Sequence, residues 1–98
     1  MTTRQQISDL LSYGAIRTKK SFARSTQIYM EKLITLSKVD NLMNRRKAYS
    51  IVLKTSKFTR KELIKKLFEE ISKKYRTRKG GYTRLLRVTE KVFVVQLL

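Results

Sequence analysis

The chain has 98 residues, with 24 lysines and arginines against 7 aspartates and glutamates, which leaves a net charge of +17. This length suits a single domain, and so large a charge excess favours a polyanionic partner, above all nucleic acid, over an anionic membrane or an acidic protein. Cysteine and histidine are absent, which excludes disulfides, thiolate and imidazole chemistry and the usual zinc ligands. We therefore expect no enzymatic activity, no cofactor and no small-molecule substrate, and no apolar run approaches the roughly 20 residues of a membrane span.

The first predicted elements are a helix, a short strand and a longer helix. Apolar residues recur at helical spacing over residues 4–12, and Gly14 follows as a C-cap. An extended segment covers residues 15–18. The low acid content of residues 1–25 is also typical of an organellar presequence, an alternative that the pattern leaves open. A second helix is predicted from about 19 to 38 by the recurring positions Phe22, Thr26, Tyr29, Leu33 and Leu36.

Two further helices are predicted in the middle of the chain. Asp40 is expected to be the N-cap of a helix at about 41–54. Thr59 and Glu62 fit the capping box of the next helix, with Phe58 just before the cap. Because the aromatic residues fall on apolar stripes, we expect those at positions 22, 29, 49, 68 and 75 to lie in the core. The stripe of the last helix is Leu63, Ile64, Leu67, Phe68 and Ile71.

The C-terminal part predicts a β-hairpin. Residues 82–88 and 91–97 are rich in β-branched, aromatic and apolar side chains, and a tight turn at Thr89-Glu90 joins them. The order of helix, strand, three helices and hairpin predicts an α+β fold of two layers, with the helices packed on one face of a small mixed sheet. Residues 1–98 are expected to form this one domain.

A basic run in the third predicted helix, Arg45-Arg46-Lys47, is the first candidate for nucleic-acid binding. Adjacent side chains on a helix point about 100° apart, so the two arginines cannot both lie on one buried stripe. Planar guanidinium groups suit bidentate contacts to phosphate. The alternative is an ordinary solvated helix face.

The segment before the hairpin is the second candidate, because basic residues alternate there with aromatics and two glycines. Glycines without Cβ let the backbone approach a phosphate closely, and Tyr82 is expected to stack on a base or ribose. The alternative is a helix-to-strand loop in which glycine serves only as a C-cap. The candidate residues are Arg76, Arg78, Lys79, Gly80, Gly81, Tyr82, Thr83 and Arg84.

The basic face of the fourth predicted helix discriminates poorly between partners. Such a helix also suits a membrane surface or a calmodulin-like groove, although Glu69 and Glu70 argue against an anionic bilayer. A basic DNA-binding or chromatin-like module, with one helix in a major groove, is the main alternative function. The basic residues are spread over every predicted element, which favours a protein embedded in RNA.

Four strings resemble the bacterial-type large-subunit ribosomal protein seventeen family: LITLSKVD at 33–40, NRRKAY at 44–49, KLFEEI at 66–71 and RKGGYTRLL at 78–86. The resemblance implies a two-layer α/β fold and a structural role on large-subunit ribosomal RNA near the peptide exit tunnel, beside ribosomal proteins twenty-two and thirty-two. It also implies that residues 4–18 are mature structure. By matched position, RNA contact or loop shaping is implied for Arg45, Arg46, Arg78, Gly80, Gly81, Tyr82, Thr83 and Arg84.

The chain departs from the family at its N-terminus. Members of the family usually begin with a longer basic extension, which is short or missing before the first predicted helix here. Together with the lysine-rich, histidine-free composition, this difference favours an organelle (a mitochondrion or plastid) or a reduced genome, and hence an organellar ribosome over one in the bacterial cytoplasm.

Overall fold

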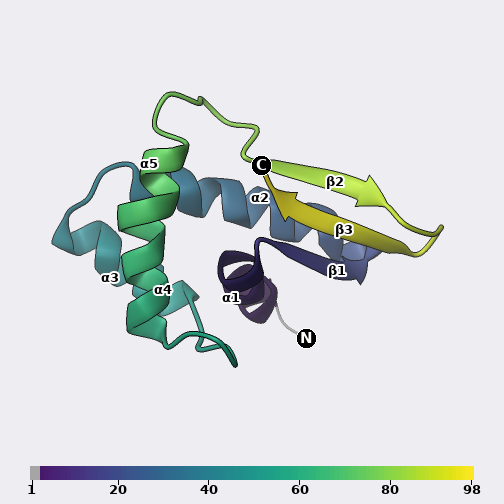
Figure 1. Cartoon of the computed structure of the whole chain (residues 1–98), viewed down its shortest axis with the longest axis horizontal. Coiled ribbons are helices and arrows are strands. Elements are labelled where there is room, and N and C mark those ends of the chain that lie inside the picture. The colour runs from purple at the N-terminus through teal and green to yellow at the C-terminus, as the bar shows by residue number, and fades with distance from the viewer. Residues whose placement is uncertain (1–2) are drawn as a thin grey trace.

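A computed structural model describes residues 3–98. The predicted order of helix, strand, three helices and hairpin is confirmed (Figure 1). The last helix before the hairpin is continuous, but a π-helical turn, η1, lies between its two α-helical segments. The elements are α1 (Thr3–Tyr13), β1 (Ala15–Lys19), α2 (Lys20–Ser37), α3 (Leu42–Ile51), α4 (Arg60–Lys66), η1 (Leu67–Ile71), α5 (Ser72–Lys74), β2 (Thr83–Arg87) and β3 (Val92–Leu97).

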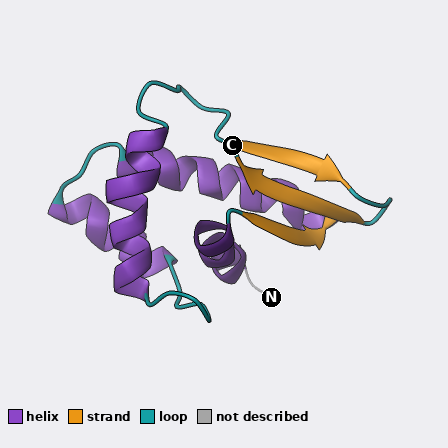
Figure 2. Ribbon diagram, in the orientation of Figure 1, coloured by secondary structure: helices purple, strands orange, loops and turns teal. Residues whose placement is uncertain are grey.

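The sheet is antiparallel throughout, so the prediction of a mixed sheet was wrong. Its order is β1-β3-β2, and β3 pairs antiparallel with both neighbours, Val95 lying opposite Ile16 on one side and Leu85 on the other. The short turn between β2 and β3 requires these two strands to pair antiparallel. Helix α2 runs behind the sheet and contacts all three strands, so that the helices cover one face only (Figure 2).

The core lies between α1, α2, the α4–α5 helix and the inner face of the sheet. Completely buried apolar side chains come from each of these elements, among them Leu10, Ile34, Leu63 and Val95. Burying polar groups is costly unless they are paired. Accordingly, the buried Gln6 amide donates to the Thr18 hydroxyl at 2.9 Å and accepts from the Thr26 hydroxyl, which joins α1, β1 and α2.

The helix caps agree with the sequence at one helix and differ at another. Thr59 and Glu62 form the predicted capping box, with hydrogen bonds of 3.3 and 3.1 Å. The N-cap of α3 is Asn41, whose side chain accepts from the Asn44 N–H at 2.8 Å; the prediction of Asp40 was wrong. Helix α3 also ends at Ile51, three residues short of the expected 54, because Val52 is extended.

Only part of the predicted aromatic core is buried. Phe68 and Tyr75 are 3% and 2% exposed, but Phe22, Tyr29 and Tyr49 are 45%, 54% and 38% exposed, so the prediction was wrong for them. The buried stripe of α2 is displaced by about one position from the predicted one, and both stripes have helical spacing. It consists of Ala23, Thr26, Met30, Leu33, Ile34 and Ser37.

Candidate RNA-binding surface

The two glycines before β2 have backbone conformations that other residues rarely adopt. Gly80 and Gly81 have φ angles of +105° and +66°, and a Cβ at either position would meet no atom within 4 Å. Glycine is therefore required here by the turn of the backbone and not by lack of space. We call residues 76–82, which connect α5 to β2, the glycine loop.

Two side chains of α2 hold the glycine loop in place. The Glu31 carboxylate accepts a hydrogen bond from the Tyr82 N–H at 3.0 Å. The Lys38 ammonium donates to the Arg78 carbonyl and lies 4.7 Å from the centroid of the Tyr82 ring. These residues were not singled out from the sequence. Their spacing of seven places them on one face of α2, but nothing local indicates that the loop lies against that face.

Tyr82 is part of the core and does not present its ring to solvent. Its side chain is 2% exposed, its ring centroid lies 5.3 Å from that of Tyr75, and its hydroxyl donates to the Arg78 carbonyl at 3.0 Å. The hydrogen bond from Lys38 lowers the pKa of the Tyr82 hydroxyl. The expected stacking on a base was therefore wrong for this structure, and Tyr82 shapes the loop instead. Thr83 is buried as well, at 7% exposure.

The remaining residues predicted in this segment face solvent. Arg76, Arg78, Lys79 and Arg84 are all exposed. Within residues 3–98 the Gly81 N–H has no hydrogen-bond acceptor. The glycine loop thus combines a backbone held by α2 with exposed cationic side chains and a backbone donor, which suits a phosphate group.

The basic run of α3 is divided between an internal and an external role. Arg45 forms a bidentate ion pair with Asp40, with N–O distances of 2.6 and 2.8 Å, and its guanidinium lies 5.1 Å from the Phe68 ring centroid. The hydrogen bond between them lowers the pKa of Asp40 and raises that of Arg45. Arg46 and Lys47 are exposed, so they present the free charge of this run.

Arg84 belongs to a third area, the open face of the sheet. Val95 is completely buried, and its partners Ile16 and Leu85 pack on the core. Because side chains alternate along a strand, the neighbouring positions point away from the helices. The open face consists of Ala15, Arg17, Lys19, Arg84, Leu86, Val92, Val94 and Gln96.

The structure therefore separates the predicted site residues into three areas. The glycine loop and α3 lie on either side of α5, and Arg84 lies on β2 (Figure 1).

Comparison with known proteins identifies the family of the chain. A family model described as ribosomal protein L17 matches residues 2–93. The chain belongs to the ribosomal protein L17 family. Members of this family are structural constituents of the large ribosomal subunit, and the chain is accordingly a ribosomal protein that takes part in translation. This membership decides against the DNA-binding or chromatin-like module.

Individual relatives in the L17 family cover most of the chain. Large ribosomal subunit protein bL17 of Ureaplasma parvum is 43% identical over 90% of this chain and 74% of its own length. The bL17 of Mycoplasma pneumoniae is 44% identical over 90% of this chain and 71% of its own length. The bL17 of Thermoanaerobacter sp. is 41% identical over 87% and 70%. These relatives are bacterial, so they give no support to the organellar location expected from the sequence.

Proposed function

We propose that this L17-family protein binds and stabilises large-subunit ribosomal RNA near the peptide exit tunnel, with the glycine loop as its main contact. The observation that carries the proposal is the way α2 holds the loop. Glu31 and Lys38 fix the backbone at Tyr82 and Arg78. A loop whose conformation is set before binding loses little conformational entropy when it meets RNA.

The charged side chains around this loop support a phosphate-binding role. Arg78 and Lys79 are exposed beside the glycines, and Arg46 and Lys47 are exposed on α3. Arginine and lysine contacts to phosphate supply most of the sequence-independent affinity for nucleic acid. We assign Arg45 a supporting role, because Asp40 already occupies its guanidinium. We assign Tyr82 and Thr83 to loop shaping, because both are buried.

Ribosomal proteins twenty-two and thirty-two are the neighbours that the family resemblance implies, and we propose them as partners. The exposed apolar side chains on and beside the open face of the sheet favour a protein contact there. Leu86 and Val88 are 41% and 46% exposed, and Val94 lies opposite Leu86 in the ladder. Apolar area at an interface is stabilising because it leaves water.

We propose that the protein has a structural and not a catalytic role. Within residues 3–98 no group of acidic side chains is placed to hold a metal ion. No helix in the same range is long and apolar enough to cross a membrane. The proposal rests on the basic glycine loop. The two observations on metal sites and membrane spans only agree with it.

Co-sedimentation with ribosomal subunits tests the proposal directly. The purified protein is mixed with large or small subunits in high-magnesium buffer and centrifuged through sucrose. We expect saturable co-sedimentation with large subunits that lack their own copy of the protein, and crosslinks from position 79 to RNA at the tunnel exit. Equal binding to both subunits, or crosslinks elsewhere on the large subunit, would contradict it.

A further inference from the structure

A hollow of about 350 Å³ lies between the end of α2 and the helix formed by η1 and α5. Of its lining residues, only Arg76 was predicted from the sequence to bind RNA. The hollow adjoins the glycine loop, because Arg76, the first residue of that loop, lines it and Lys38 borders both. Its lining consists of Ser37, Lys38, Asp40, Phe68, Ser72, Lys73 and Arg76.

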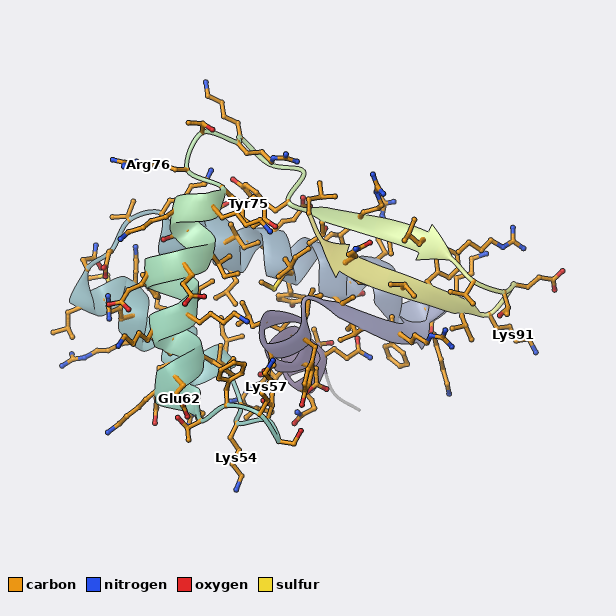
Figure 3. All side chains as sticks on the ribbon, in the orientation of Figure 1. Lys54, Lys57, Glu62, Tyr75, Arg76 and Lys91 are labelled. Atoms are coloured by element: carbon orange, nitrogen blue, oxygen red, sulfur yellow. The ribbon has the colours of Figure 1, made fainter. Side chains whose placement is uncertain are left out.

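Three cationic side chains from two elements meet at this hollow. Lys38 comes from the end of α2, whereas Lys73 and Arg76 come from α5 and the residues just after it. Lys73 and Arg76 are exposed, and Lys38 is half-buried. Figure 3 shows that Arg76 and Tyr75 leave the end of α5 in opposite directions, Tyr75 toward the sheet and Arg76 away from it. The turn that buries Tyr75 therefore directs Arg76 to the hollow side.

The one carboxylate at the hollow is already paired. Asp40 accepts both hydrogen bonds of the Arg45 guanidinium, at 2.6 and 2.8 Å. The buried hydroxyls of Ser37 and Ser72 donate to carbonyls of their own helices, at 2.6 and 2.5 Å. The charge of Asp40 is therefore offset by Arg45, which lies outside the lining of the hollow.

Lys38 can serve the hollow and the loop together. An ammonium group has three donors, and the Arg78 carbonyl accepts from one of them. A ligand in the hollow would therefore draw on the same cation that fixes the glycine loop. An anion bound here would therefore meet the first residue of the loop that we propose as the main RNA contact, Arg76.

We propose that this hollow binds one phosphate of the RNA backbone, contacted by Lys73 and Arg76 and further stabilised by Lys38. The inference rests on the proposed function, since the phosphate belongs to the bound ribosomal RNA. An arginine and a lysine placed together suit phosphate oxygens, through a planar fork and a point charge.

The test compares two double variants that remove the same charge. Lys73→Gln with Arg76→Gln removes the two exposed cations of the hollow. Lys61→Gln with Lys65→Gln is the control, because both lysines are exposed on α4 and do not line the hollow. Affinity for large-subunit ribosomal RNA is measured over a series of salt concentrations, and circular dichroism checks that each variant is folded.

We expect the hollow variant to bind about tenfold more weakly, as the loss of a charge-assisted contact implies. The slope of log K against log salt should become shallower by about 0.7–0.9, the value for one phosphate. The control should lose less than about threefold. An equal loss in both variants would overturn the hollow as a site and leave the proposed function standing. If the unaltered protein binds no ribosomal RNA, both proposals fall.

Inorganic phosphate is a second probe that separates the hollow from RNA binding as a whole. In nuclear magnetic resonance titrations with phosphate, amide shifts should saturate around Ser37 and Ser72–Arg76 and disappear in the hollow variant. Shifts spread evenly over the lysine-rich helices would contradict a localised phosphate site.

Discussion

Gly80 and Gly81 occupy positive φ values, while the lysines around them lie on solvated surfaces where one charge can replace another. The contacts that fix the loop were beyond sequence reasoning, because Glu31 and Tyr82 are 51 residues apart. The same packing explains why Tyr82 is buried and not free to stack. What the sequence did predict at this scale is local: a glycine pair at a turn and a capping box at Thr59.

Replacing Gly80 and Gly81 together with alanine should weaken ribosomal RNA binding at least tenfold. Forcing alanine into a left-handed conformation costs about 1–2 kcal/mol per residue, so the loop backbone will change its path. The control is Lys65→Ala with Lys66→Ala, which should change affinity less than about threefold. Circular dichroism and RNA affinity are measured on the same samples. If stability and affinity fall in proportion, the glycines serve folding alone.

Replacing Glu31 with alanine should weaken RNA binding by about three- to tenfold, even though the net charge rises from +17 to +18. The reason is that the Tyr82 N–H loses its acceptor and the loop its fixed conformation. The matched control is Glu70→Ala, which makes the same charge change on an exposed position and should tighten binding slightly. Tighter binding by both variants would show that charge alone governs affinity.

The order and type of the helices and strands could be predicted from periodicity and turn residues. The end of helix α3 and the buried stripe of α2 could not. Two apolar stripes with helical spacing exist on α2, and only the position of the sheet decides which is buried. Helix α3 buries only Ala48 completely. Arginines from elsewhere in the chain bind its carbonyl end, and such long-range contacts leave no periodic signal.

Arg4 and Arg60 both bind the carbonyl end of α3. Arg4 donates to the Ile51 and Ser50 carbonyls at 3.0 and 2.8 Å, and Arg60 donates to the Val52 carbonyl at 3.0 Å. Cations at a helix C-terminus are stabilising, by about 0.3–1 kcal/mol each at exposed sites.

Arg60→Ala should therefore lower the free energy of unfolding by about 1 kcal/mol and reduce hydrogen-exchange protection mainly in α3. Urea denaturation and amide exchange measure the two effects. Arg87→Ala, an equal loss of charge on an exposed strand position, is the control and should leave α3 unchanged. Uniform loss of protection across the chain would contradict a local role for Arg60.

The property of the whole molecule that follows directly from its composition is a net charge of +17 on 98 residues. The described cations are spread over helices, loop and sheet, and within residues 3–98 only Asp40 and Arg45 form an ion pair. Self-repulsion of so many like charges opposes folding in the absence of a polyanion.

Sulfate or phosphate should therefore raise the melting temperature of the isolated protein. An anion at ten times its dissociation constant stabilises a folded state by about 1.4 kcal/mol, which for a domain of this size corresponds to about 5–10 °C. Sodium chloride at equal ionic strength is the control. The same melting temperature in all three salts would argue against a fold that needs bound anions.

The salt dependence of binding to large-subunit ribosomal RNA is the most direct measurement of how the protein functions. Contacts to about 6–10 phosphates predict a slope of log K against log salt of about −4 to −9, together with tighter binding than to small-subunit RNA. A slope near −1, or equal affinity for the two RNAs, would show that the basic surface is not built for the large subunit.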